Sequence, residues 1–161
     1  MSLEPHTDRA VAIIAGGTGR PARDIARGLA AWGWPIVVVY LEDQAQAEAT
    51  ITEIIAAGGT AVAVRAALRD DLDVIRLFTE STAAFGVVDV LIDTTTEHSE
   101  PLYQRAAQYV REGGMIVIPP GTATMSAGLA STLRRRSIAV GRVPPAAVLI
   151  FLERWRQQNH R

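Results

Sequence analysis

Residues 10–22 read AVAIIAGGTGRPA, and this stretch decides the fold class. Its first part, Ala10–Ala15, is apolar throughout, as in a strand that is covered on both faces. A glycine-rich turn, Gly16–Gly19, follows the strand. Pro21 then suits the first turn of a helix, where the missing N–H of proline costs nothing. The order of strand, glycine turn and helix predicts the first unit of a parallel sheet whose strands are joined by helices.

The same alternation of short apolar runs and longer amphipathic runs continues through the chain. We expect strands at Ala10–Ala15, Ile36–Leu41, Ala61–Arg65, Val87–Ile92, Met115–Ile118 and Ile138–Val143. We expect helices at Pro21–Ala31, Asp43–Ala57 (starting at Asp43 or Gln44), Asp70–Ala84, Pro101–Glu112, Thr124–Arg136 and Ala146–Gln157. Right-handed crossovers then predict an α/β fold, a doubly wound parallel sheet (Rossmann fold) with strand order 3-2-1-4-5-6 and helices on both faces.

Composition narrows the class of protein. A length of 161 residues predicts a single Rossmann-type dinucleotide-binding domain over 1–161, with residues 1–9 as a disordered N-terminus. The net charge of −1 gives no basic field for nucleic acid or an anionic membrane. The chain has no cysteine, and its three histidines are far apart, so we expect no metal site. No apolar run is long enough to span a membrane, and we expect a cytoplasmic protein.

The glycine turn is the candidate phosphate site. Gly17-x-Gly19-x-x-Ala22 matches the pattern G-x-G-x-x-A, in which small residues let a pyrophosphate approach backbone N–H groups at a helix N-terminus. The residues expected to hold phosphate are Gly16, Gly17, Thr18, Gly19 and Arg20. The alternative is a tight strand-to-helix turn that binds no ligand, because a glycine pattern alone is a weak signal.

The end of the second strand bears on the choice of nucleotide. NAD-binding proteins of this fold usually carry an acidic residue there for the ribose hydroxyls, and this chain has Tyr40. The missing acid and the nearby Arg20 favour NADP over NAD. Glu42 and Asp43 would favour NAD if either reached the ribose. The other interpretation of these two acids is that they complement the dipole of the helix that they begin.

Residues 10–96 resemble the short-chain dehydrogenase/reductase family, especially its ketoacyl-carrier-protein reductases. The segments that carry the resemblance are Ile36–Tyr40, Ala57–Ala61, Val62–Val64 and Phe85–Ile92. Gly113–Val117 and Ile138–Pro145 extend it more loosely. The resemblance implies a reductase that uses NAD or NADP on a small carbonyl substrate. By position it places Tyr40 near the adenosine ribose, Ala67 and Leu68 near adenine, and Thr94 and Thr95 near the nicotinamide ribose.

The departures from the family fall on functional positions. The family's Tyr-x-x-x-Lys pair, in which lysine lowers the pKa of the tyrosine, has no counterpart because the chain contains no lysine. The family's Asn-Asn-Ala-Gly after the fourth strand is Asp93–Thr96 here. We therefore expect a truncated, degenerate homologue, a weak or inactive oxidoreductase that serves as a nucleotide-binding module. Its catalytic residues remain unassigned. The alternatives are an active oxidoreductase with an unusual proton donor, Asp93 or His98, and a structural or partner-binding subunit without ligand.

Two segments near the C-terminus are candidates for binding or subunit-contact surfaces. Arg134–Arg136 complements the dipole at a helix C-terminus, or else binds phosphate or a partner. Ala146–Trp155 is apolar on more than one helical face. We expect part of that helix to pack on the sheet and part to form the contact of a homo-oligomer.

Overall fold

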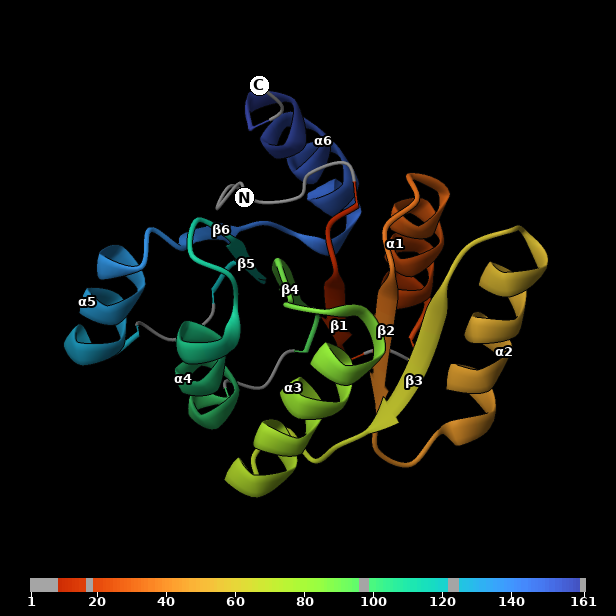
Figure 1. Cartoon of the computed structure of the whole chain (residues 1–161), viewed down its shortest axis with the longest axis horizontal. Helices are drawn as coiled ribbons and strands as arrows, with labels where there is room; N and C mark the ends of the chain where they lie inside the picture. Colours follow the sequence, from red (N-terminus) through yellow and green to blue (C-terminus); the bar gives the residue numbers. More distant parts are fainter. Residues whose placement is uncertain (1–8, 17–18, 96–98, 122–124, 160–161) are drawn as a thin grey trace.

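The computed structural model describes residues 9–16, 19–95, 99–121 and 125–159 (Figure 1). Within these residues, six parallel strands form one sheet in the order β3-β2-β1-β4-β5-β6. The strands are β1 (Ala12–Ala15), β2 (Ile36–Tyr40), β3 (Ala61–Arg65), β4 (Val90–Asp93), β5 (Met115–Ile118) and β6 (Ala139–Arg142). The predicted doubly wound sheet and its strand order are confirmed. The N-terminal residues predicted to be disordered lie almost entirely outside the described part of the chain.

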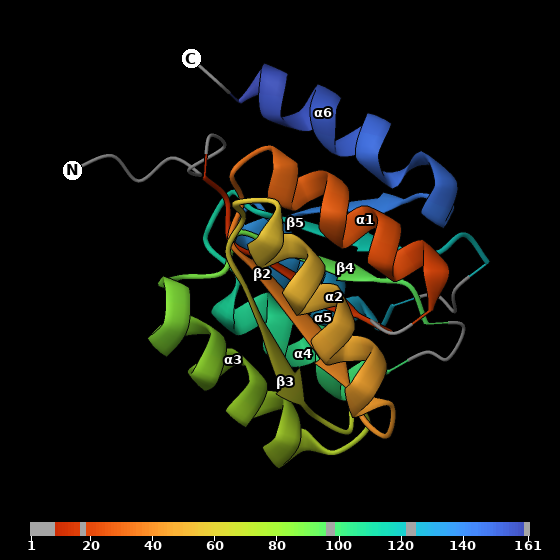
Figure 2. The same ribbon diagram turned by 90° about the vertical axis from the view of Figure 1, so that its right-hand side faces the viewer.

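Helices cover both faces of the sheet. The helices α1 (Arg20–Ala31), α2 (Gln44–Ala56) and α6 (Val148–Gln158) lie on one face, and α3 (Asp71–Phe85), α4 (Glu100–Tyr109) and α5 (Ala127–Arg135) lie on the other (Figure 2). A short 3₁₀ turn, η1 (Pro145–Ala147), precedes α6. Alternate strand residues supply the two cores: Ile14 packs toward α1, whereas Ile13 packs toward α3 and α4. This two-sided burial is why the strands read as continuous apolar runs.

Several element ends differ from the sequence prediction. Strand β4 begins at Val90 rather than Val87, because Val88 and Asp89 use their backbone groups outside the regular ladder. Helix α4 ends at Tyr109 rather than Glu112, because the backbone of Val110 is extended. Helix α5 begins at Ala127 rather than Thr124, and the hydroxyl of Ser126 caps it by accepting from the Leu129 N–H. Strands β3 and β5 have the predicted bounds, and the remaining ends match or shift by one or two residues, as helix and strand ends commonly do.

A buried ion pair holds the amino edge of the sheet, the edge where the parallel strands begin. Asp89 is 1% exposed. One of its oxygens accepts from the Val11 N–H at 2.9 Å, and the other accepts from Arg111 Nε at 2.9 Å. The Arg111 N–H donates in turn to the Val88 carbonyl. Asp89 thus ties β1, β4 and the segment after α4 into one unit.

The three tryptophans of the chain form one cluster at this amino edge, on the α6 face. Trp32 and Trp34 lie between α1 and β2, and their rings meet edge to face at 5.3 Å. Trp34 is fully buried and meets Trp155 of α6 at 6.3 Å. The guanidinium of Arg156 lies 4.3 Å from the ring centre of Trp32. Since Gly28 of α1 also leaves no room for a Cβ beside Leu149, α6 packs closely against α1.

Candidate functional site

The candidate site lies at the carboxyl edge of the sheet, where the strands end and ligands bind in doubly wound folds. Gly16 follows β1 with a φ of +85°. A Cβ at this position would lie 2.6 Å from Thr94 Oγ1 and 2.9 Å from Thr95 Cγ2. Both the backbone conformation and the crowding therefore require glycine. Because Gly16 has no side chain, the backbone just after β1 is accessible where it borders the site.

The remainder of the glycine turn is less constrained in the described residues. Gly19 is the N-cap of α1, and a Cβ there would meet only the Pro21 ring at an ordinary 3.8 Å. Arg20 is the first residue of α1, with a side chain that is 85% exposed and 3.8 Å from Asp24. Gly17 and Thr18, which we also expected to hold phosphate, lie outside the described residues.

Thr94 fastens the end of β4 to the end of β1. Its backbone N–H donates to the Ala15 carbonyl at 3.0 Å, and its hydroxyl donates to the same oxygen at 2.9 Å. This double contact lies directly behind Gly16. Thr94 therefore positions the glycine turn.

Asp93 ends β4 as a buried carboxylate, 2% exposed. One of its oxygens accepts from both the backbone N–H and the hydroxyl of Thr95, at 2.9 Å and 2.6 Å. Its other oxygen accepts a short hydrogen bond from the Tyr103 hydroxyl. Burial and the bond to Asp93 raise the pKa of the Tyr103 hydroxyl far above its usual value. The Tyr103 hydroxyl and the Asp93 carboxylate are thus hydrogen-bonded to each other beneath the site.

A pocket of about 640 Å³ opens beside Gly16, between the ends of β1, β2, β3 and β4. Its volume is in the range of small-molecule sites. Its lining residues are Gly16, Val39, Tyr40, Leu41, Glu42, Asp43, Ala66, Ala67, Leu68, Arg69, Thr95 and Ser99. Five of the residues singled out from sequence, namely Gly16, Tyr40, Ala67, Leu68 and Thr95, thus border one cavity.

The loop after β3 is held in place by two side chains from neighbouring helices. The Ala67 N–H donates to Asp73 of α3 at 2.8 Å, and this bond holds the pKa of the Asp73 carboxyl below its usual range. The Ser99 hydroxyl donates a short hydrogen bond to the Leu68 carbonyl and also caps α4. Sequence reasoning missed Asp73, Ser99 and Arg69. Only the position of Arg69 just after the third strand could have pointed to it.

The acidic residues after β2 divide into two environments. The carboxylate of Asp43 accepts from the Gln46 N–H at 3.3 Å and caps α2. This contact matches the helix-start interpretation of the sequence. Glu42 is exposed at the rim of the pocket beside Tyr40.

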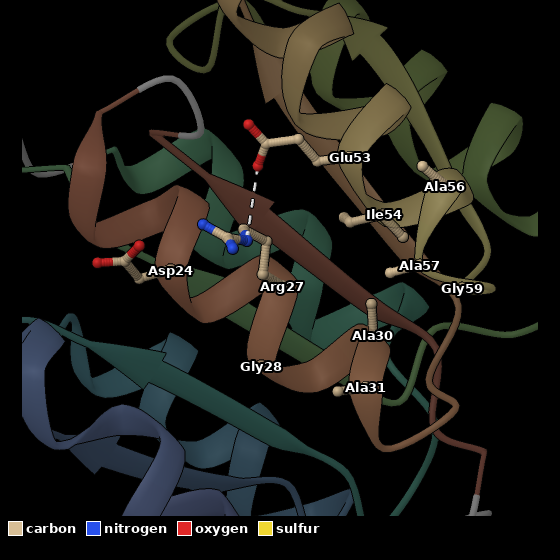
Figure 3. A pocket seen from close by; sticks show the side chains of 10 residues that line it. All are labelled: Asp24, Arg27, Gly28, Ala30, Ala31, Glu53, Ile54, Ala56, Ala57 and Gly59. Atoms are coloured by element: carbon tan, nitrogen blue, oxygen red, sulfur yellow. Dashed lines mark ion pairs between the residues drawn. The ribbon is translucent and has the colours of Figure 1, made fainter.

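A second hollow lies between α1 and α2, away from the strand ends. It measures about 890 Å³ and is lined mainly by small residues of the two helices, with Arg27 and Glu53 forming a 3.5 Å ion pair across it (Figure 3). Arg27 and Glu53 are thus engaged with each other, and Asp24, the third charged residue of the lining, lies 3.8 Å from Arg20. The carboxyl-edge pocket remains the better candidate because its polar groups surround a bare backbone.

The described residues contain neither a metal-binding cluster nor a membrane-spanning helix. Among them, no three His, Cys, Asp or Glu side chains come together as a metal-binding group. Nor does any helix in the described ranges have the length and apolar character needed to cross a bilayer.

Strand order and the glycine after β1 define a Rossmann-type α/β protein. The chain belongs to the short chain dehydrogenase family, since the sequence model of that family matches residues 10–111. The relationship to this oxidoreductase family, expected from the sequence, is confirmed.

Individual relatives agree with this assignment. Short chain dehydrogenase claC of Passalora fulva is 28% identical over 134 residues, which cover 69% of this chain and 50% of that protein. A 3-oxoacyl-[acyl-carrier-protein] reductase of Synechocystis is 35% identical over 83 residues, covering 52% of this chain and 34% of that protein. The chain thus spans about half the length of the first curated relatives it matches.

Solved structures show the same fold. A short-chain dehydrogenase from Oenococcus oeni superposes with a TM-score of 0.75 at 16% identity, covering 94% of this chain and 92% of that one. A dehydrogenase from Burkholderia cenocepacia with bound NADP gives a TM-score of 0.66 at 24% identity, covering 85% of this chain and 70% of that one.

Proposed function

We propose that this chain is a nucleotide-binding module that holds NADP(H) or NAD(H) in the pocket beside Gly16. The observation that carries the proposal is the bare backbone of Gly16, forced by its positive φ and by Thr94, at the border of a 640 Å³ cavity. Membership of the family and the NADP bound by a structural neighbour support it.

Each part of the dinucleotide would meet a suitable group. The pyrophosphate would lie against Gly16 and Gly19, where the N-terminus of α1 offers N–H groups and a partial positive charge. Gly17 and Thr18 keep the same proposed role. The adenosine ribose would lie near Tyr40.

The two ends of the nucleotide would meet apolar and hydroxyl groups. Adenine would lie against Ala67 and Leu68, which line the half of the pocket nearest β3. The nicotinamide ribose would lie near Thr94 and Thr95, beyond Gly16.

Within this proposal, NADP is the preferred form. Arg69 lines the pocket that contains Tyr40, and Arg20 lies at the glycine turn, so the proposed nucleotide would have guanidinium groups of the kind that bind a 2′-phosphate near it. Of the two acids that would favour a free ribose hydroxyl, Asp43 is engaged in capping α2, and Glu42 lies at the rim of the pocket.

We further propose that the module binds the nucleotide without transferring hydride. The chain has no lysine to lower the pKa of a tyrosine. Tyr103, the tyrosine nearest Asp93, is fully buried and donates to that carboxylate, and its pKa is raised rather than lowered. A proton donor needs the opposite shift. Turnover of a small carbonyl substrate would require a proton donor other than Tyr103.

Assembly through the C-terminal helix also remains a proposal. On α6, Val148, Leu152 and Trp155 are buried against the rest of the fold, whereas Ile150 is 64% exposed. Sedimentation of wild type and Ile150→Glu tests it. A shift to a smaller species in the variant is the expected result, and an unchanged profile contradicts it.

Calorimetric titration with NADPH and then NADH tests the binding proposal. We expect saturable binding of NADPH in the micromolar range, worth about −8 kcal/mol, and weaker binding of NADH. The Gly16→Val variant should lose the signal, whereas Gly33→Val, a change at a positive-φ glycine remote from the pocket, should retain it. A folded protein that gives no heat with either nucleotide would refute the proposal. Oxidation of NADPH with a panel of carbonyl compounds would refute the absence of turnover.

A further inference from the structure

Arg23, in the first turn of α1, has a buried donor without an acceptor. The side chain is partly buried, and its Nε atom is fully buried and makes no hydrogen bond. Buried donors that lack an acceptor are uncommon in native proteins, because desolvating them costs free energy. Such a group is often explained by an ion, a water or a functional role. Arg23 therefore needs an acceptor that the described side chains do not supply.

Helical spacing places Arg23 on the side of α1 that faces α2. Arg27, one turn further along α1, forms a 3.5 Å ion pair with Glu53 of α2 (Figure 3). Ala30 lies on the same side, because a Cβ at Gly59, after α2, would be 3.3 Å from its methyl group. Residues four and seven positions apart share one side of a helix. Arg23, four positions before Arg27 and seven before Ala30, therefore points toward α2.

The turn that contains Arg23 lies at the carboxyl edge of the sheet. Helices α1 and α2 run side by side in the same direction, and each begins a few residues after a strand ends (Figure 2). Tyr40, at the end of β2, packs against the same core cluster as Ala22 and Ala26 of α1. Tyr40 and the three residues after it line the pocket beside Gly16. Arg23 thus lies beside the glycine turn, on the side where β2 ends.

The carboxylates at this edge do not neutralise Arg23. Asp24 lies 3.8 Å from Arg20, and Asp43 caps α2. Glu42 is exposed at the rim of the pocket and forms no ion pair with Arg23. Within the described ranges, the guanidinium of Arg23 is thus a positive charge that an anionic ligand could match.

We propose that Arg23 binds the 2′-phosphate of NADP(H) and thereby sets the preference of the site for NADP(H) over NAD(H). This inference rests on the proposed nucleotide site and assigns its selectivity to one residue. With the pyrophosphate at the glycine turn and the adenosine ribose near Tyr40, a 2′-phosphate comes close to the space between α1 and α2. Its oxygens supply the acceptor that Nε lacks, and the planar guanidinium fits a phosphate with two parallel hydrogen bonds.

Arg23 differs from the two arginines already placed near the nucleotide. Arg20 has a side chain that is 85% exposed, and Arg69 is exposed in the loop after β3. Water screens the attraction between an exposed guanidinium and a phosphate, whereas a partly buried guanidinium is screened less. Arg23 therefore contributes more to the selectivity than either of them.

Calorimetric titration of wild type and Arg23→Met with NADPH and NADH tests the inference. Wild type should bind NADPH more tightly. In Arg23→Met, which keeps an unbranched side chain but loses the guanidinium, affinity for NADPH should fall about tenfold or more. Affinity for NADH should change by less than about twofold, because NADH has no 2′-phosphate. The matched control is Arg27→Met, on the same side of α1 but paired with Glu53, which should leave the ratio of the two affinities unchanged.

Thermal denaturation separates a binding role from a structural one. Since Arg23→Met removes a buried donor that has no acceptor, its melting temperature should equal or exceed that of wild type. A variant that melts lower and loses affinity for both nucleotides equally would overturn the inference. Inorganic phosphate alone should not bind more tightly than about 1 mM. Tighter phosphate binding that Arg23→Met abolishes, with the nucleotide ratio unchanged, would overturn the inference in favour of a separate anion site.

The outcome for wild type distinguishes this inference from the proposed function. If folded wild type binds neither nucleotide, the proposed function fails and the inference fails with it. If wild type binds both nucleotides and Arg23→Met leaves their ratio unchanged, the nucleotide site stands and only the role of Arg23 is refuted.

Discussion

Two buried carboxylates mark the two ends of strand β4, one just before it and one at its last residue, and they are held in different ways. Asp89, at the amino edge, is paired with the guanidinium of Arg111 and the Val11 N–H. Asp93, at the carboxyl edge, is held by the hydroxyl and N–H of Thr95 and by the Tyr103 hydroxyl. The two residues are 1% and 2% exposed, so burial alone does not distinguish them.

The different partners of Asp89 and Asp93 match the different roles that we infer for the two edges of the sheet. The charge pair at the amino edge joins β1, β4 and the segment after α4. At the carboxyl edge the partners are uncharged side chains, and the adjacent Gly16 leaves the backbone open to the pocket. We infer that the amino edge carries more of the stability and the carboxyl edge more of the binding.

The sharpest way to break this comparison is to remove Asp89. Asp89→Ala leaves Arg111 and the Val11 N–H without their buried partner, and we expect unfolding free energy to fall by about 3–5 kcal/mol in urea denaturation. The matched change is Asp71→Ala, which removes an exposed pair with Arg105. Its loss should be far smaller. Equal losses in the two variants would show that Asp89 has no special role.

The next largest effect is expected at Gly16. Gly16→Ala combines an unfavourable left-handed backbone with the clash against Thr94, and we expect a loss of about 2–4 kcal/mol together with loss of NADPH binding. Gly33→Ala has a similar φ but open space around the new Cβ, and it should lose about 1–2 kcal/mol. Chemical denaturation of both variants measures the difference. Identical losses would mean that the contact with Thr94 is unimportant.

A double-mutant cycle sharpens the comparison at Asp93. Tyr103→Phe removes one donor to the buried carboxylate and should lower stability by about 1–3 kcal/mol. Asp93→Asn keeps the shape but changes the acceptors. If the two groups act together, the combined variant should show a coupling of about 0.5–3 kcal/mol. Simple additivity would assign the two residues independent roles.

The smallest expected effect concerns pH. The Ala67 N–H, with help from Arg76, holds the pKa of Asp73 below its usual range. The stabilisation is therefore present above the unfolded pKa of about 3.9 and is lost as pH falls through the lower folded value. Urea denaturation of wild type should show this acid loss, and Asp73→Asn should flatten it. Parallel pH profiles for the two proteins would contradict the assignment.

The sequence predicted the sheet more fully than the site. Apolar runs separated by amphipathic ones are enough to specify parallel strands and their order, and the turn at Gly16 marks the edge where ligands bind. Tyr40, Ala67, Leu68 and Thr95 then gather beside it because they follow neighbouring strands.

What the sequence did not predict depends on side-chain direction across long separations. The bond from Ser99 to the Leu68 carbonyl joins residues 31 positions apart, and spacing along the chain does not reveal it. The sequence pattern places Asp89 inside a predicted strand, and the pattern does not indicate that its carboxylate accepts a hydrogen bond from Arg111. The bond from the Thr94 hydroxyl to the Ala15 carbonyl joins residues 79 positions apart, and spacing along the chain does not reveal it either.

The tryptophan cluster has an optical consequence. Because Trp32, Trp34 and Trp155 lie together where α6 packs on α1, all indole emission comes from one spot on the amino edge. A fluorescence change therefore reports on the attachment of α6. The oxidised nucleotide, entering beside Gly16 at the opposite edge, would leave the shape of the emission spectrum unchanged unless it altered that attachment.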